Sequence, residues 1–383
     1  IYTPLKPACR AKFQKNQNVS ISRHLENWLT FAYFASRLTT LRSHIAMKHY
    51  LYTLILTVAI TLCASLTGHA TDRFKLKHLE TGTGLSNNRI NSILKDDDGF
   101  LWIATTSGLC RYDGYDIKLY ISDPDSPGGT GNNNIEEIHR APDGRLWILA
   151  GSDYIIYDPA TETFIRDIAE TMKDMGIDGK PSKVLFDSKG AMWLYVKKLG
   201  IYRLKPGEMK AVGVEGLIHS AHEITDMAEG NGIIIGVDNS GVISLIDSES
   251  LKITRRITHI AETETSGYNY VYTADVDRDG NVWVFNTEQL WLYDPLHDRW
   301  LTDKLPAQGR NMVVKTMYQG LNGEIWIGRD HHGLERVIKD PDGIKFEQVW
   351  GESEGTHGSN NTVTTLFEDD GGTMWIGTYK RGL

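Results

Sequence analysis

The sequence predicts an all-β fold, a seven-bladed β-propeller of four-stranded antiparallel blades, from residue 71 to residue 383. Three observations lead to this prediction. A phrase of an acidic or polar residue, Gly, two residues, Trp and an apolar residue recurs along the chain, and its period is near 45 residues. Each period holds short alternating segments between Gly- and Asp-rich turns. Such units bury both faces only by stacking, and radial stacking gives a propeller.

One anchor residue marks each repeat, and we expect it to fill the space between neighbouring blades. The spacings between successive anchors are 45, 46, 41, 49, 43 and 49 residues. The fourth repeat is degenerate, because Ile stands where the others have Trp. The anchors are Trp102, Trp147, Trp193, Ile234, Trp283, Trp326 and Trp375.

The first repeat shows the expected strands most clearly. Alternation predicts strands over residues 90–95, 101–105, 108–112 and 117–120, with an Asp- and Gly-rich turn after the first. The segment Phe164 to Gly179 departs from this pattern. Its apolar residues have helical spacing, which predicts a short helix or a long loop inserted at the rim of the second blade.

The ends of the repeat region predict how the ring closes. Residues 74–79 resemble an outermost strand without a blade of its own, so we expect them to complete the last blade. Only eight residues follow Trp375, and Gly382-Leu383 corresponds to the start of a third strand, as Gly108-Leu109 does in the first repeat. The sequence therefore predicts that the last blade is incomplete, that its third strand is missing and that the natural protein continues.

The residues before the repeats are of two kinds. Residues 1–46 carry seven Lys or Arg against one acid, Glu26, and are interpreted as non-native upstream sequence. Residues 47–70 have a positive start, an apolar run and a small residue at Ala70, which predicts a cleaved signal peptide and export to the periplasm. An uncleaved anchor is the alternative, but the run of about 16 residues is short for a spanning helix.

Charge and cysteine content narrow the possible partners. The net charge of −8 gives no general attraction to nucleic acid, so we expect no nucleic-acid contact by this region. After the predicted cleavage Cys110 is the one remaining cysteine, and it has no internal disulfide partner.

The repeat phrases resemble the two-component-regulator propeller repeats of hybrid sensor kinases in glycan-degrading gut bacteria. The resemblance covers residues 74–383 and is clearest in the first repeat, in the Gly84-Leu85-Ser86-Asn87-Asn88 segment, the Asp-Gly-x-x-Trp-Ile phrase and the Gly-Leu-x-Arg-Tyr-Asp-Gly phrase. The degenerate fourth repeat, and the third and fifth repeats, which lack a clear Gly-Leu-x-Arg-Tyr strand, depart from the family pattern.

This resemblance implies a larger receptor. Members carry two such propellers, a β-sandwich, one membrane helix, a histidine kinase, a receiver and usually a DNA-binding domain. It implies that the chain is the periplasmic sensor portion of an inner-membrane-anchored homodimer that detects an oligosaccharide and controls carbohydrate-utilisation genes through phosphorelay. The alternatives are a free-standing exported binding or scaffold module and, less favoured, a propeller hydrolase or lyase.

The candidate ligand residues lie in the loops between second and third strands. These loops differ from repeat to repeat, whereas the acidic turns on the opposite face are nearly uniform, and function is usually grafted where loops vary. Polar groups, cations and an aromatic side chain would suit a sugar, including a sulfated or uronic one. The candidates are Lys197, Lys198, Arg329, His331, His332, Tyr379, Lys380 and Arg381.

Metal and catalytic sites are weakly indicated. Asp275, Asp277 and Asp279 resemble the start of a calcium loop, but position 12 is Asn286 rather than the bidentate Glu. His331 and His332 are adjacent, so their side chains should diverge on a strand. No serine elbow, Cys–His pair or phosphate loop is present, and the acids differ in position from those of sialidase boxes. We therefore expect no cofactor, no metal and no catalytic residues in this region.

Overall fold

The computed structural model describes residues 2–3, 75–122, 129–217, 222–263, 270–307, 312–340, 343–351 and 361–383. Contacts divide the chain into two units, one of residues 1–3 and 76–383 and another of residues 4–75. The predicted signal peptide and nearly all of the upstream segment lie outside the described residues, so both stay predictions.

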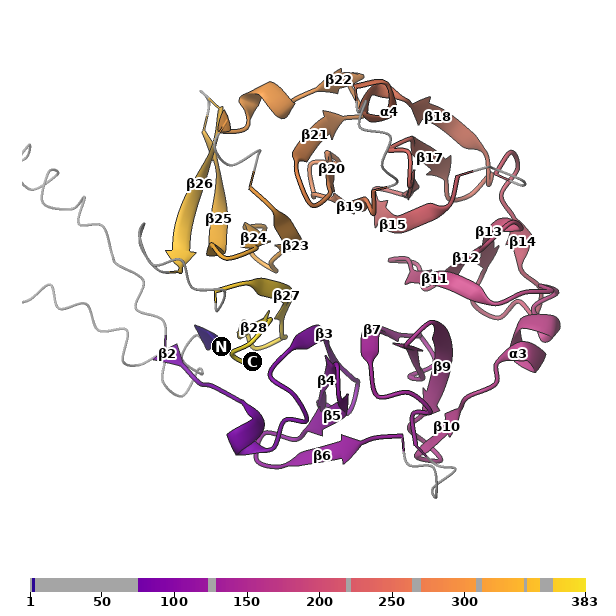
Figure 1. The fold of residues 1–383 in the computed structure, drawn as a ribbon. Helices are drawn as coiled ribbons and strands as arrows, with labels where there is room; N and C mark the ends of the chain where they lie inside the picture. Colours follow the sequence, from indigo (N-terminus) through magenta and orange to yellow (C-terminus); the bar gives the residue numbers. More distant parts are fainter. Residues whose placement is uncertain are drawn as a thin grey trace, which may run out of the picture. The chain divides into compact units, whose positions relative to one another are not determined.

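The first unit is a ring of seven antiparallel sheets, each of four strands (Figure 1). The first strand of each sheet lies next to the ring axis and the last lies outside. This arrangement confirms the predicted all-β propeller. The four strands predicted for the first repeat have the observed bounds.

The first three blades are built from consecutive strands. Blade 1 consists of β3 (Ile90–Lys95), β4 (Leu101–Thr105), β5 (Gly108–Tyr112) and β6 (Ile117–Tyr120). Blade 2 consists of β7 (Ile135–Arg140), β8 (Leu146–Ala150), β9 (Asp153–Asp158) and β10 (Thr163–Ile165). Blade 3 consists of β11 (Pro181–Phe186), β12 (Met192–Val196), β13 (Gly200–Leu204) and β14 (Val212–Gly213).

The next three blades follow the same order. Blade 4 consists of β15 (Ile224–Gly230), β16 (Ile233–Asp238), β17 (Ile243–Asp247) and β18 (Ile253–Ile257). Blade 5 consists of β19 (Thr273–Val276), β20 (Val282–Phe285), β21 (Leu290–Asp294) and β22 (Arg299–Trp300). Blade 6 consists of β23 (Val314–Gln319), β24 (Ile325–Arg329), β25 (Gly333–Asp340) and β26 (Gly343–Trp350).

Blade 7 combines segments from both ends of the chain. Its order is β27 (Val363–Glu368), β28 (Met374–Thr378), β1 (Tyr2–Thr3) and β2 (Lys75–Leu76). The outermost position of β2 agrees with the expectation for residues 74–79. The third position, which we expected to be empty, is taken by β1 in the structure, with Tyr2 paired to Met374.

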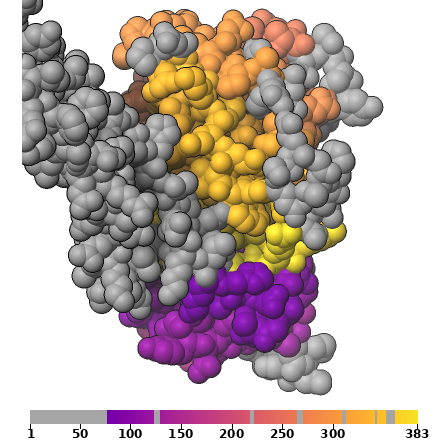
Figure 2. All heavy atoms as spheres, turned by 90° about the vertical axis from the view of Figure 1, so that its left-hand side faces the viewer, coloured from indigo at the N-terminus to yellow at the C-terminus, as the bar shows by residue number. Residues whose placement is uncertain are grey.

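Backbone hydrogen bonds join Leu79 and Leu383 reciprocally, at 2.7 and 2.9 Å between N and O. Leu383 thus begins a third-strand ladder against the segment that follows β2. The surface of blade 7 (yellow) borders blade 1 (indigo) in Figure 2.

In blades 1, 3 and 6 a glycine begins the third strand, and in blade 6 the outer strand crosses close behind it. At Gly333 (φ +87°) an added Cβ would lie 2.0 Å from the carbonyl oxygen of Trp350, and at Gly382 (φ +78°) 2.2 Å from that of Leu79. The matching geometry supports the correspondence between Gly382-Leu383 and the third-strand starts of other blades. The Gly-Leu phrase of the repeats is therefore a requirement of backbone packing.

The anchor residues fill the space between blades, as predicted. All seven are buried. Trp102 packs with Ile148 and Tyr157 of blade 2, and Trp193 packs with Ile234 of blade 4. Burial of each large side chain between two sheets gives neighbouring blades a shared hydrophobic core.

In four blades the indole N–H also donates to an Asp six residues earlier. The pairs are Trp102 with Asp96 (2.6 Å), Trp193 with Asp187 (2.8 Å), Trp283 with Asp277 (3.0 Å) and Trp375 with Asp369 (3.2 Å). The same Asp accepts backbone N–H groups of its own turn; Asp369, for example, accepts from Gly371 and Thr373. One carboxylate thus holds the turn and the anchor together.

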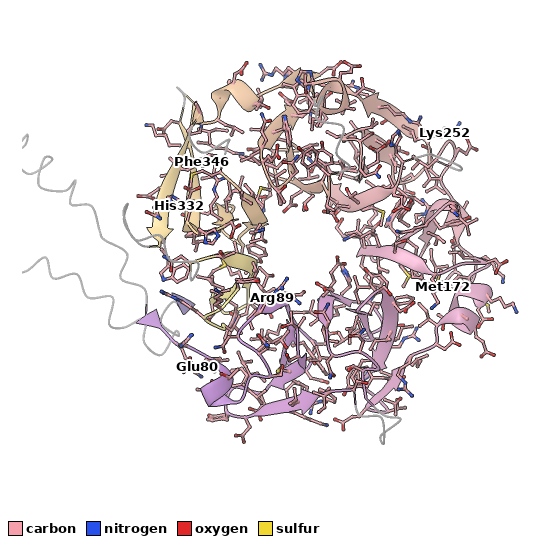
Figure 3. All side chains as sticks on the ribbon, viewed as in Figure 1. Glu80, Arg89, Met172, Lys252, His332 and Phe346 are labelled. Carbon is pink, nitrogen blue, oxygen red and sulfur yellow. The ribbon has the colours of Figure 1, made fainter. Side chains whose placement is uncertain are left out.

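The predicted insertion in blade 2 contains the helix α3 (Ala169–Asp174). Apolar side chains of this segment, Met172 within the helix and Ile168 directly before it, are buried against blade 3 residues such as Leu194. Met172 lies at the outer rim of the ring in Figure 3. The start of the insertion is corrected, because Phe164 and Ile165 belong to β10, where they pair with β9.

Candidate binding face

The two faces of the ring carry different connections. The hairpins between first and second strands, and between third and fourth strands, lie on one face, which we call the turn face. The loops between second and third strands, and those entering the first strands, lie on the other, which we call the loop face. All eight predicted ligand residues belong to connections of the loop face or to the strand ends beside them.

Arg329 is not on the exposed surface that the prediction assumed. Its side chain is fully buried in blade 6, where Nε donates to Glu335 (2.7 Å) and Nη1 donates to the Met312 carbonyl oxygen (2.9 Å). The guanidinium also lies 5.0 Å from the ring centre of Phe346. Burial works to lower the pKa of Arg329, and the Glu335 charge opposes it. These contacts give Arg329 a structural role.

Lys197 and Lys198 lie between blades 3 and 4. Lys197 forms an exposed ion pair with Glu223, with 2.8 Å between Nζ and Oε2. Lys198 has a left-handed backbone, with φ of 65°. The cavity beside Lys198, which His222 also lines, has a volume of about 10 Å³, so it has room for no more than one water.

The two histidines lie in the turn between β24 and β25 rather than on a strand, and their side chains approach different acids. His331 Nε2 lies 3.6 Å from Asp330, and the His331 backbone N–H donates to Thr362 (3.0 Å). His332 Nε2 lies 3.4 Å from Glu335, and its carbonyl oxygen accepts from Gln348 of the outermost strand. Figure 3 accordingly shows His332 on the outer side of blade 6. In the described ranges no group of three or more His, Cys, Asp and Glu side chains is arranged to hold a metal.

The remaining candidates gather where blade 7 meets blade 1. Tyr379 is 40% exposed, and the Lys380 ammonium lies 5.9 Å from the centre of its ring. Arg381 follows directly, with its backbone N–H donating to Thr378 (2.8 Å). Here the structure brings together three of the eight predicted residues.

The sequence analysis missed a fourth member of this group. The Arg89 guanidinium lies 4.9 Å from the ring centre of Tyr379, across the junction between the two blades. Figure 3 shows Arg89 on the inner side of the ring. Its position directly before the first strand of blade 1 places it on the loop face, so topology could have identified it. We call Arg89, Tyr379, Lys380 and Arg381 the basic platform.

The loop that resembles a calcium site is occupied by protein donors. The Asp277 side chain is fully buried and accepts from Trp283, Asn281 and the Lys339 ammonium (3.0 Å). Lys339 also pairs with Asp279. The lysine supplies the positive charge that a metal would otherwise provide.

A hollow of about 520 Å³ lies on the turn face between blades 5 and 6. Its charged lining residues interact with one another or with the backbone. Arg278 donates to the carbonyl oxygens of Gly320 and Leu321, and Arg336 pairs with Glu324. Because these groups stabilise the junction of two blades, the hollow is a weaker candidate for ligand binding than the loop face.

Charged side chains also line the inner wall of blades 2 and 3. Glu137 Oε1 lies 2.7 Å from the Lys183 ammonium, and Oε2 accepts from Tyr154 (3.0 Å) and contacts His139 (3.1 Å). Burial works to raise the pKa of Glu137, but the His139 hydrogen bond and the Lys183 charge hold it far below its usual value. Burial and the Glu137 charge raise the pKa of Tyr154.

The inner wall of blades 4 and 5 has two more acids. Asp226 accepts from the Ala274 backbone N–H (3.2 Å), and Asp275 accepts from its neighbour Val276 (2.8 Å). Burial raises the pKa of Asp226 to about 6, against the opposing charge of Lys183. Burial, together with the charges of Asp226 and Asp277, raises the pKa of Asp275 to about 7.

The fold and the repeats together define a β-propeller repeat protein with a variable loop face. Two stretches, residues 84–107 and 357–380, match the model of the two component regulator propeller family. The chain therefore carries two component regulator propeller repeats, as the sequence resemblance predicted. A search of curated proteins finds no match to the chain.

Solved structures share the fold. The extracellular domain of a proposed hybrid two component system from B. thetaiotaomicron has 20% identity and a TM-score of 0.61, over 80% of this chain and 41% of that one. A second such domain from the same organism has 19% identity and a TM-score of 0.56, over 78% and 40%. At these identities the likeness shows the fold alone. The chain spans about two fifths of the length of these structures.

The same fold occurs in proteins of other kinds. The WD40 propeller domain of Doa1 has 11% identity and a TM-score of 0.51, over 78% of this chain and 93% of that one. Within the described residues, no helix has the length and apolar character needed to cross a membrane.

Proposed function

We propose that the chain is the periplasmic sensor portion of a hybrid two-component regulator. In this proposal it detects an oligosaccharide, and the complete receptor, a homodimer with a further propeller, a β-sandwich and a histidine kinase, controls carbohydrate-utilisation genes by phosphorelay. The observation that carries the proposal is the match of two repeats to the two component regulator propeller family. The extracellular domains that share the fold support it.

The architecture suits a sensor. Seven blades with shared cores form a stiff ring, and the loops of one face vary in residue type. A ligand that bridges the described loops between second and third strands of neighbouring blades would therefore bind to side chains carried directly by the ring, which reduces the entropy cost of binding. The exposed aromatic and cationic side chains between blades 7 and 1 are the groups best placed for this.

Binding and transcription test the proposal together. The purified chain is titrated by calorimetry with a panel of neutral and acidic oligosaccharides. In the encoding bacterium, transcripts induced by the bound sugar are then compared with and without the gene. We expect at least one sugar to bind and its utilisation genes to lose their induction in the deletion strain. Induction that persists without the gene would contradict the regulatory role.

A free-standing exported binding or scaffold module is the second candidate. The fold alone is consistent with it, since a propeller ring of this kind is also found in the WD40 domain of Doa1. Sequencing the gene downstream of Leu383 separates the two candidates. Further repeats, a membrane helix and a kinase histidine are expected for a sensor, whereas a stop codon soon after the seventh blade indicates a free-standing module.

A further inference from the structure

The outer strand of blade 6 is unlike the other outer strands. β26 has eight residues, whereas the outer strands of the other blades have two to five. It stands last in the order of its sheet, so within the described residues no strand pairs with its outer edge. Figure 2 looks onto this side of the ring. A long free edge presents unpaired backbone N–H and C=O groups, with which a further strand can pair.

This edge is regular over six residues. β26 pairs with β25 in unbroken register from residue 343 to residue 348, and a bulge then ends the run. Ile344 and Phe346 turn toward the core that blades 5 and 6 share, and they pack against its buried residues. Lys345 and Glu347 alternate with them and are exposed on the opposite face of the sheet. The edge therefore combines free backbone groups with a charged face.

The sequence of the edge is complementary to itself. When two copies of β26 pair antiparallel about a two-fold axis through Phe346, each residue faces the one at the mirror position of the other copy. Lys345 then faces Glu347 of the other copy, and Glu347 faces Lys345, so two pairs of opposite charge form. Phe346, which Figure 3 labels, meets its own counterpart, and Ile344 meets Gln348. In this register no like charges oppose one another.

The charges inside each chain extend the same arrangement. Lys345 Nζ lies 2.5 Å from Asp340 Oδ2, and Arg336 Nη2 lies 2.6 Å from Glu347 Oε2. The side chains of Lys345 and Glu347 are nevertheless 71% and 49% exposed. An ammonium has three donors and a carboxylate accepts several hydrogen bonds, so each group can keep its own partner and take a second one. In such a pair, positive and negative side chains alternate from Arg336 of one copy to Asp340 of the other.

Another outer strand shows an edge without this complementarity. β18 is the next longest outer strand, with five residues, and its middle residue is Arg255. The same two-fold pairing of β18 would place two Arg255 side chains opposite each other, and like charges that face each other directly destabilise a sheet. Arg255 is also engaged with blade 5, where it donates to Tyr293 (2.9 Å) and pairs with Asp298 (3.0 Å). Of the two longest outer strands, β26 is therefore the one suited to a second copy.

We propose that β26 pairs antiparallel with β26 of a second copy of this chain, so that the two copies of blade 6 form one continuous sheet of eight strands. The inference rests on the proposed function, whose receptor is a homodimer, and it identifies the surface at which two propellers meet. One pair of strands buries less area than a stable dimer needs, so the contact is weak in solution. Two copies held in one membrane would meet at a much higher effective concentration.

Sedimentation velocity of the full chain over a range of concentrations tests the contact. We expect a reversible equilibrium between monomer and dimer. Glu347→Lys should weaken the dimer by roughly 10-fold or more, because it sets like charges opposite each other at two positions, and Lys345→Glu should do the same. The double variant, Lys345→Glu with Glu347→Lys, should recover most of the affinity, because opposite charges face each other again.

The double variant also separates pairing from folding. Within one chain the exchange sets each new charge beside a like charge, that of Asp340 or that of Arg336. An effect on folding alone would therefore make the double variant the weakest of the three, whereas pairing between copies makes it the strongest. Urea midpoints of all variants check that each ring is folded.

Lys118→Glu is the matched control. Lys118 is an exposed lysine of the outer strand β6, and its ammonium lies 3.3 Å from the Glu162 carboxylate, so it resembles Lys345 in exposure and pairing. Its replacement removes an exposed ion pair from the rim of the ring without touching β26. The dimer should be unchanged in this variant.

The outcomes separate the two proposals. Weakening by each single variant, with recovery in the double variant, supports pairing through β26. A chain that stays monomeric at every concentration, a dimer that both single variants leave intact, or a double variant weaker than both overturns this surface. Such results leave the oligosaccharide titration and the transcript comparison unaffected, because those experiments measure detection and regulation rather than contact between propellers.

Discussion

The turn face and the loop face use similar acidic residues in different ways. On the turn face, the buried Asp277 accepts from Trp283 and Lys339, so its charge stabilises the junction of turn, anchor and strand. On the loop face, the Asp330 side chain is 27% exposed and accepts from Thr362 (2.7 Å), while the Lys315 ammonium lies at 3.7 Å. Of these two carboxylates, the one on the turn face is therefore built into the packing of the ring, and the one on the loop face is partly open to solvent.

The largest effect on the free energy of unfolding should come from replacing a glycine, and its size should differ between the loop face and the turn face. Gly333→Ala should lower the free energy of unfolding by about 3–5 kcal/mol, because the new Cβ meets the Trp350 carbonyl oxygen in a left-handed backbone. Gly99→Ala on the turn face also has a positive φ (89°), but nothing lies within 4 Å of its Cβ. It should cost only about 1–2 kcal/mol. Urea unfolding of both variants measures the difference, and equal losses would show that the loop face is not rigidly packed beneath its side chains.

The next largest effect on the free energy of unfolding should come from replacing the two carboxylates compared above, Asp277 and Asp330. Asp277→Ala should lower the free energy of unfolding by about 2–4 kcal/mol, since it leaves the Trp283 N–H and the Lys339 ammonium without their acceptor. Asp330→Ala should cost about 1 kcal/mol or less, because its contacts are partly exposed. Indole fluorescence during urea unfolding can follow both. A loss at Asp330 as large as that at Asp277 would remove the distinction between the faces.

The inner wall adds a pH-dependent effect. The pKa of Asp275 is about 7 in the folded ring and about 4 in an unfolded chain. Between these values the folded state holds a proton that the unfolded state has released, so the free energy of unfolding falls as pH rises from 4 to 7. Asp275→Asn should remove most of this slope and stabilise the ring by about 1–3 kcal/mol at pH 8, with little effect at pH 4.

Urea titrations at pH 4.5, 6 and 8 measure this slope. Asp226 is still present in the Asp275→Asn variant, and burial raises its pKa to about 6. The free energy of unfolding of the variant should therefore still fall with rising pH, but less steeply than that of the parent. Parallel pH profiles for the parent and Asp275→Asn would show that Asp275 does not carry the proton.

The sequence was sufficient for the ring because its signals are local. The anchor Trp, the Asp-Gly turn and the third-strand Gly each depend on contacts within one blade or its neighbour, so they recur with the period of the chain. Phe164 and Ile165 were misassigned because their spacing fits both a strand and the start of a helix. The place of Tyr2–Thr3 in blade 7 has no periodic signal.

The candidate site was only partly predictable. Loop position identified Tyr379, Lys380 and Arg381, but Arg89 meets Tyr379 across 290 positions of the chain, and residue type alone does not reveal that contact. Arg329 has the right residue type at a loop boundary, yet its side chain turns into blade 6 to meet Glu335. The direction of a long side chain depends on its partners, which a single sequence does not specify.

The smallest predicted effect tests whether the turn-face acid is general. Blade 2 has Ala141 six residues before Trp147, where four other blades have Asp, and its turn has the same backbone bond, from the Ala141 N–H to the Arg145 carbonyl oxygen (2.9 Å). Ala141→Asp should therefore offer the Trp147 indole an acceptor and stabilise the ring by about 0.5–1.5 kcal/mol.

In blade 6 the equivalent Gly320 leaves no room, since a Cβ there would lie 2.7 Å from Glu368 Oε2, which already accepts from Leu321. Gly320→Asp should instead destabilise the ring through steric conflict and repulsion between carboxylates. Opposite shifts of the urea midpoint in the two variants would show that the neighbouring blade decides where the acid is tolerated, whereas two losses would mean that burying the new carboxylate outweighs its hydrogen bond to the anchor.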